Sequence, residues 1–251
     1  MQTTWIAVAG AFLLASYVKG TTGMGFPLIA TPMVAMLVDI RTTYALLLLP
    51  NILMDVLQIA RGQLPWHLWR RLAPLFATTV LGVFLGTRIL VAVPERAIFL
   101  CLAGTIALYL VSVRLRLDLR MPERWEPYLG ALTGMAAGVL TGVTNAIGPI
   151  GAFYVLTLQL EKREFVKAVA SIFLVAKLSQ LAAVAHWGFF TSKILHWSAG
   201  LTLVALGAFW VGLATQDRVR QETFLRVLYA LLFAMALFFV YRGLIVGGVA
   251  H

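Results

Sequence analysis

Charged residues are scarce in this chain: they make up 12% of its 251 residues, whereas a typical soluble domain is about one quarter charged. Hydrophobic residues make up 61%. The shortage of charge excludes an ordinary soluble domain, whose surface needs many more charged side chains. The composition instead predicts an integral membrane protein that lies in the lipid bilayer.

Cysteine is nearly absent as well, because Cys101 is the one cysteine of the chain. This excludes an internal disulfide and a cysteine metal cluster. We find no metal-ligand spacing, cofactor motif or catalytic constellation, so the sequence predicts no metal, no cofactor and no enzyme. A basic group is also missing before the first apolar run, so we expect the amino terminus to stay in the membrane as a helix rather than to be a cleaved signal.

Ten apolar segments divide the chain. They lie near residues 4–18, 27–38, 42–60, 66–90, 95–115, 127–141, 149–160, 164–185, 191–213 and 220–246. Crossing a bilayer takes roughly 20 helical residues, and the segments on either side of residues 20–27 and 142–149 have only about 12 to 15, which reach about 18 to 23 Å. We therefore expect each of these two pairs to form a re-entrant hairpin, and the other six segments to span the membrane.

The two glycine- and proline-containing stretches, residues 20–27 and 142–149, mark an internal repeat with an offset of 122 residues. The offset aligns Gly20 with Gly142, Thr22 with Thr144, Pro27 with Pro149 and Gln58 with Gln180. After Ala60 the alignment slips by about four residues. We expect a first repeat at 1–116, a cytoplasmic linker at 117–126 and a second repeat at 127–251. One hairpin and three spans make an odd number of crossings, so the second repeat is expected to be inverted.

Basic residues outnumber acidic ones, 20 to 10, and give a formal net charge of +10. They occur singly or in small groups between apolar runs, which argues against nucleic-acid binding and for loop charges on one membrane face. With the first hairpin entering from outside, thirteen lysines and arginines fall on inner loops and five on outer loops or ends. The positive-inside rule then predicts that both termini lie outside.

The two hairpin tips are the candidate substrate site. Pro27 and Pro149 fit the first turn of a returning half-helix, where the missing N–H of proline costs nothing. Two helix amino termini at the membrane centre would attract an anion. The predicted substrate-binding residues at the tips are Gly20, Thr21, Thr22, Gly23, Gly25, Thr144, Asn145 and Gly148. The alternative is that the glycines only let helices pack closely.

Ionisable residues inside apolar segments add to this site, because such residues usually line substrate or proton paths. Asp55 and Lys177 are aligned by the offset of 122. Asn51 and Gln58 share a helix face with Asp55, and Gln180 shares one with Lys177. We expect Lys177 and Gln180 to bind the anion, Asp55 to exchange a proton, and Asn51 and Gln58 to line the path. The alternative is a permanent ion pair between Asp55 and Lys177; Lys19, just before the first tip, is a further candidate ligand.

Three stretches resemble the sulfite exporter TauE/SafE family: VKGTTGMGFPLIATP at 18–32, GVLTGVTNAIGPIG at 138–151 and EFVKAVASIFLV at 164–175. The resemblance covers nearly the whole chain. It implies a multi-pass protein with two homologous halves that moves sulfite, sulfonates, thiosulfate or related organic anions across the bacterial inner membrane. The chain departs from the family pattern in two ways: the first tip has fewer consecutive glycines, and Lys177 stands where a neutral residue is more usual.

The sequence therefore predicts an all-helical secondary transporter that carries a small anion by alternating access and couples it to protons. Two alternatives stay open, an anion channel and an intramembrane enzyme. The sequence also leaves open the specific anion, the direction of transport and the oligomeric state, a homo-oligomer included.

Overall fold

A computed structural model describes residues 2–61, 66–115, 122–145, 148–187, 191–215 and 221–245, and its regular structure within these ranges is entirely helical. The helices are α1 (Gln2–Thr22), α2 (Phe26–Ala35), α3 (Ile40–Ala60), α4 (Trp66–Ala92), α5 (Glu95–Leu115), the short 3-10 helix η1 (Glu123–Trp125), α6 (Glu126–Thr144), α7 (Gly148–Thr157), α8 (Lys162–His186), α9 (Ser192–Thr215) and α10 (Gln221–Ile245). Residues 117–121, half of the predicted linker, lie outside the described ranges.

The chain is a multi-pass membrane protein. Within the described ranges four helices are long and apolar enough to cross a bilayer: Ile40–Ala60, Trp66–Ala92, Arg163–His186 and Ser192–Thr215. These are α3, α4, α8 and α9, whereas we expected six spans. The other two expected spans, α5 and α10, have 21 and 25 residues, but their described parts do not meet the same criterion of length and composition.

The lengths around the two tips differ from the expectation. The helices before the two tips are longer than expected: α1 has 21 residues and α6 has 19, which corresponds to roughly 30 Å of helix. The helices after the tips, α2 and α7, are short, with 10 residues each. The expected apolar segments ended too early, because the polar residues near the ends of α1 and α6, Lys19 and Thr144, are helical and fully buried.

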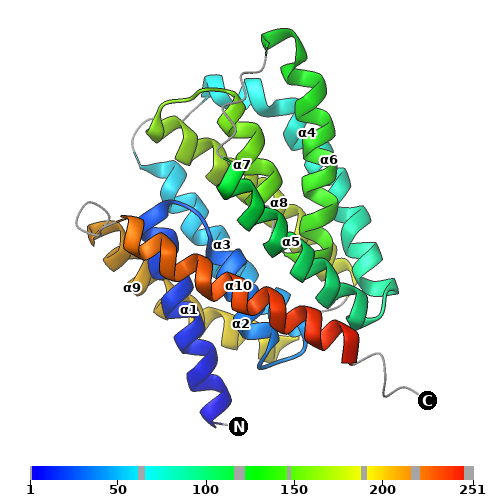
Figure 1. Ribbon diagram of the computed structural model, residues 1–251, viewed down its shortest axis with the longest axis vertical. Helices are drawn as coiled ribbons and strands as arrows, with labels where there is room; N and C mark the ends of the chain where they lie inside the picture. Colours follow the sequence, from blue (N-terminus) through cyan, green and yellow to red (C-terminus); the bar gives the residue numbers. More distant parts are fainter. Residues whose placement is uncertain are drawn as a thin grey trace.

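Helix contacts recur between the two halves of the chain. The helices of the first half, α1 to α5, correspond in order to α6 to α10. The contact of α1 with α9 then has its counterpart in α6 with α4, and α3 with α9 has its counterpart in α8 with α4. Two further contacts, α3 with α8 and α5 with α10, each join a helix to the corresponding helix of the other half. In Figure 1, α4 and α6 lie side by side, and so do α5 and α10.

Glycines allow the closest of these contacts. A Cβ added at Gly20 would lie 2.9 Å from the Cα of Gly212, and one added at Gly86 would lie 3.0 Å from the Cα of Gly142. The offset of 122 aligns Gly20 with Gly142, and the same offset with the slip of four aligns Gly86 with Gly212. The two close contacts are therefore equivalent, and each joins a helix of one half to a helix of the other.

The Gly212 contact gives a direct test of this packing. Gly212→Ala would place a Cβ 3.0 Å from the Cα of Gly20, and overpacking of this kind costs about 1–3 kcal/mol. We expect the melting temperature in detergent to fall by several degrees. The matched control is Gly207→Ala on the same helix, where an added Cβ meets nothing within 4 Å, and it should leave the melting temperature unchanged or slightly raised. Equal effects of the two substitutions would contradict this account.

The two main hydrophobic clusters also cross the halves. The larger combines buried residues of α1, α2, α3, α4 and α5 with residues of α9 and α10, such as Phe12, Leu47 and Phe209. The smaller combines residues of α4 with residues of α6, α7 and α8, such as Leu72 and Phe173. Helix α3 contributes to the larger cluster and α8 to the smaller one, and the two helices contact each other. The polar side chains described next lie on these two helices and on the ends of α1 and α6.

Candidate functional site

Three charged side chains are fully buried near the α3–α8 contact. They are Lys19 on α1, Asp55 on α3 and Lys177 on α8, each with 0% exposure. Charged groups inside a membrane protein are costly and usually line a path for substrate or protons. Their arrangement therefore decides what this part of the molecule can bind.

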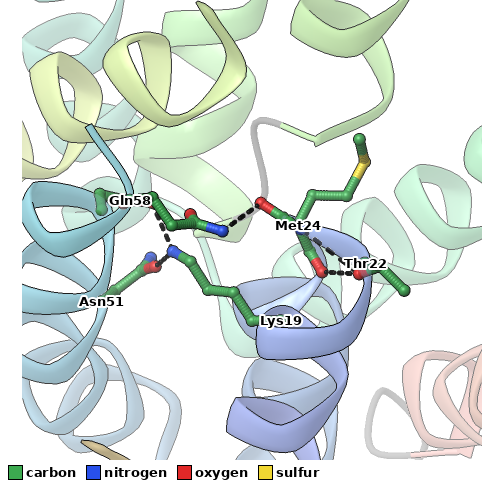
Figure 2. A network of polar contacts seen from close by, with 7 residues as sticks. Lys19, Thr22, Met24, Asn51 and Gln58 are labelled. Atoms are coloured by element: carbon green, nitrogen blue, oxygen red, sulfur yellow. Dashed lines mark hydrogen bonds and ion pairs between the residues drawn. The ribbon is translucent and has the colours of Figure 1, made fainter. Parts of the chain in front are cut away.

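Lys19 and Asp55 form a buried ion pair. The Nζ of Lys19 lies 2.5 Å from Oδ1 of Asp55 and donates a second hydrogen bond of 2.8 Å to Oδ1 of Asn51. The same Nζ lies 5.8 Å from the ring centre of Phe173 on α8. Lys19 is thus held between α3 and α8, and Figure 2 shows it extending from α1 towards Asn51.

The expected alternative of a direct Asp55–Lys177 ion pair is wrong. Asp55 contacts Lys19, and Lys177 is close enough only to interact with that carboxylate electrostatically. Lys177 donates instead to three uncharged acceptors: 2.9 Å to the backbone oxygen of Asn145, 2.9 Å to Oε1 of Gln180, and a short bond to Oδ1 of Asn145. The reason is local, since the carbonyl end of α6 lies within reach of Lys177 and carries partial negative charge.

Asn145 forms the end of the second tip. It caps α6 with a φ of 61°, in the left-handed region that asparagine tolerates better than most residues. Its Nδ2 donates to Oγ1 of Thr31 on α2 at 2.9 Å, and Gln180 donates from Nε2 to the backbone oxygen of Thr141 at 3.2 Å. The second tip is therefore tied to α8 and also to the short helix of the first half.

Gln58 ties the first tip to α3 in a corresponding way. Its Nε2 donates to the backbone oxygen of Gly23 at 3.0 Å, and Figure 2 shows it reaching across to this turn. Gly23 and Gly25 have φ angles of 83° and 103°, a conformation that glycine adopts without strain. The hydroxyl of Thr22 donates to the backbone oxygen of Met24 at 2.7 Å. The turn is thus fixed by glycine geometry and by side-chain hydrogen bonds.

Three buried polar atoms beside Lys19 lack a hydrogen-bond partner within the described residues: Oδ2 of Asp55, Nδ2 of Asn51 and Oε1 of Gln58. Buried polar atoms are normally paired, and unpaired ones call for an explanation such as a bound water, ion or substrate. The three atoms lie on one face of α3. This face therefore offers one free donor and two free acceptors next to a lysine.

The structure brings most of the predicted site residues together in two linked groups. Lys19, Asn51, Asp55, Gln58 and Gly23 form the first group, and Asn145, Lys177 and Gln180 form the second. Sequence reasoning missed two members, Thr31 and Thr141. The offset of 122 aligns Thr141 with Lys19, so the alignment of the two halves could have identified Thr141 as a site residue.

Several predicted residues lie at the edge of these groups. Gly20 is at the α1–α9 contact, where it permits close packing. Thr21 and Thr144 donate to carbonyl oxygens of their own helices, and Gly148 is the first residue of α7. Pro27 and Pro149 occupy the first turns of α2 and α7, as expected.

Comparison with known protein families identifies one family model that matches the chain. A family model described as sulfite exporter TauE/SafE matches residues 8–239. The match includes every residue of the two groups described above. No curated protein and no solved structure matched the chain.

Proposed function

The chain belongs to the sulfite exporter TauE/SafE family, and from this premise we propose that it is a secondary transporter of a small oxyanion such as sulfite, thiosulfate, a sulfonate or a related organic anion. The family is one of membrane transporters, and four described helices have the length and composition of membrane spans. The proposal places the substrate between the two tips, next to Lys19 and Lys177.

The imbalance of buried charge carries this proposal. Lys19, Asp55 and Lys177 are fully buried, and when ionised they hold two positive charges against one negative charge. The acceptors around Lys177 are uncharged, so they solvate its charge without cancelling it. An uncompensated buried charge costs several kcal/mol, so the surplus positive charge of this region favours an anion as the substrate. The free donor Nδ2 of Asn51 also favours an anion as the substrate.

The recurring helix contacts support transport by alternating access between two inverted repeats. The largest helix contacts have counterparts under the exchange of the two halves, which is the arrangement expected of a transporter built from two repeats. In this mechanism the site beside the buried lysines opens to either side in turn, and Asp55 takes up or releases a proton as it does so. The excess of basic residues on the predicted inner loops supports an orientation in a bacterial inner membrane with both termini outside.

Uptake into proteoliposomes tests the proposal. We expect uptake of labelled sulfite, thiosulfate or methanesulfonate to saturate, to follow a proton gradient, and to be stimulated by the same unlabelled anion on the opposite side. A channel would not show stimulation from the opposite side, and an enzyme would turn over a substrate in detergent without any gradient. Liposomes without protein are the control. Flux that shows neither saturation nor exchange would contradict the proposal.

Ligand-dependent stabilisation identifies the anion. An anion at about one hundred times its dissociation constant stabilises the folded protein by about 2.7 kcal/mol. We therefore expect a rise in the melting temperature with the transported anion, and little change with dimethyl sulfone, an uncharged analogue of methanesulfonate. Equal stabilisation by the charged and uncharged compounds would contradict an anion site.

A further inference from the structure

The two buried lysines differ in their remaining capacity to bind an anion. A lysine has three N–H donors, and Lys177 uses all three, on the backbone and side-chain oxygens of Asn145 and on Gln180. An anion could bind Lys177 directly only by displacing one of these partners. The three N–H donors of Lys177 are thus already used by Asn145 and Gln180, although its charge still acts on its surroundings.

Lys19 has capacity left. It donates to Asn51 and Asp55, and its third N–H has no oxygen acceptor among the residues that the structure describes. Oδ1 of Asn51 accepts from Lys19, and Nδ2 of the same amide is buried and has no partner within the described residues. Lys19 and Asn51 therefore present two neighbouring donors, as an oxyanion requires.

One carboxylate already occupies Lys19. Oδ1 of Asp55 lies 2.5 Å from Nζ, so an oxyanion on the third N–H of Lys19 and on Nδ2 of Asn51 would meet a second negative charge at the same ammonium. Oδ2 of Asp55 has no partner within the described residues and is free to accept a proton. We propose that Asp55 is an internal competitor of the substrate for the charge of Lys19: the oxyanion binds Lys19 and Asn51, and the Asp55 carboxylate takes up one proton as the anion binds. This inference rests on the proposed transport function and names the residues that couple the anion to the proton.

The net charge is the same in both states, and Lys177 adds one positive charge to each. Without substrate, the ammonium of Lys19 is neutralised by the carboxylate of Asp55. With a monovalent anion bound, the same ammonium is neutralised by the anion, and Asp55 is an uncharged acid. A protonated Asp55 without the anion leaves both buried ammonium groups without a negative partner, which is unfavourable. An ionised Asp55 with the anion places two negative groups on the one ammonium of Lys19, and their repulsion at short distance disfavours this state. The expected stoichiometry is one proton for each monovalent anion.

Among the described residues, the helices that contact α3 bring one further charged group to Asp55, which is Lys177. Helix α3 contacts α2, α8 and α9. The α2 helix holds no titratable residue, and Lys193 and His196 of α9 are exposed at its first turns. On α8, Lys177 interacts with Asp55 electrostatically, and its other charged residues lie within its first two turns or at its end. Lys19 and Lys177 are therefore the charged groups that face Asp55 among the described residues.

Proton uptake on binding is the first test, and it uses the unmodified protein. Methanesulfonate keeps one negative charge between about pH 5 and about pH 8, so any pH dependence of its binding belongs to the protein. We expect its affinity to fall by up to about tenfold for each pH unit above the acid plateau. A pH-indicator dye in weak buffer should report about one proton taken up for each anion bound. Binding without proton uptake would overturn the inference.

The variant Asp55→Asn is the second test. Asparagine resembles the protonated acid and cannot compete as an anion, so we expect methanesulfonate to bind at least as tightly as to the unmodified protein at low pH. Its affinity should no longer change with pH. The matched control is Asp39→Asn, an exposed residue that caps the start of the same helix, where asparagine is an equally good cap; this control should keep the original pH profile. Weaker binding by Asp55→Asn would overturn the inference.

These outcomes separate the inference from the proposed function. Saturable exchange of an anion without proton uptake would leave the transporter intact and remove the competitor role of Asp55. Absence of any saturable anion flux at all pH values would remove the proposed function itself. If Asp55→Asn does not fold, the proton count on the unmodified protein still decides the question.

Discussion

Replacing Lys19 with methionine should abolish anion uptake by proteoliposomes and also destabilise the protein. In the proposed complex Lys19 donates a charged hydrogen bond to the anion, and such a bond is worth about 1.5–3 kcal/mol, so its loss corresponds to a fall in uptake of about tenfold to a hundredfold or more. The substitution also leaves Asp55 buried without its partner, which costs about 3–5 kcal/mol. Uptake of methanesulfonate and the melting temperature in detergent measure the two effects.

A double variant separates these two effects. Lys19→Met with Asp55→Leu removes both charges, and apolar replacements of a buried ion pair are often neutral or stabilising. We therefore expect the melting temperature to recover while uptake stays absent. Lys193→Met, an exposed lysine of α9, is the control for the loss of one lysine and should change neither. Substantial uptake by the double variant would show that Lys19 is not a substrate ligand.

Replacing Lys177 with methionine is expected to act mainly on stability. The substitution leaves three acceptors without their donor, two on Asn145 at the end of α6 and one on Gln180 of α8, and each unsatisfied buried acceptor costs about 1–3 kcal/mol. The melting temperature should fall by on the order of 10 °C. The protein that stays folded should lose less affinity for methanesulfonate than Lys19→Met loses, because Lys19 and Asn51 are intact and only the more distant charge of Lys177 is removed.

A partner substitution checks this account of Lys177. Asn145→Gly keeps the left-handed backbone conformation and removes the side-chain acceptor, so the cost of the double variant should be smaller than the sum of the two single costs. A large loss of affinity at an unchanged melting temperature would instead make Lys177 a direct ligand, as the sequence suggested.

The sequence predicted well what depends on the repeat. The offset of 122 identified the two tips and placed both prolines in first turns of short helices. With the slip of four residues, it also aligns the two glycine contacts. These features depend on proline and glycine, which a given backbone geometry requires, so the same residue type at aligned positions of the two halves predicts the same local structure. Whether the second half is inverted in the membrane stays a prediction.

The sequence predicted less well what depends on contacts between helices. Lys19 ended the first apolar run by our count, yet α1 continues through it, because the fold supplies Asp55 and Asn51 as partners. The partner of Asp55 could not be chosen from spacing alone, since Lys19 and Lys177 are both distant in sequence. The choice depends on which helix ends lie beside α3, and Asn145 at the end of α6 draws Lys177 away.

The pairing of α1 with α9 has a consequence for biogenesis. The ribosome delivers α1 to the membrane before the other described helices, but Gly212 of α9, which packs against the backbone of Gly20, is made only after α2 to α8. Until then the buried ammonium of Lys19 depends on α3, which follows α1 closely. The ion pair with Asp55 is thus available early to shelter this charge from lipid, and the glycine contact completes the assembly late.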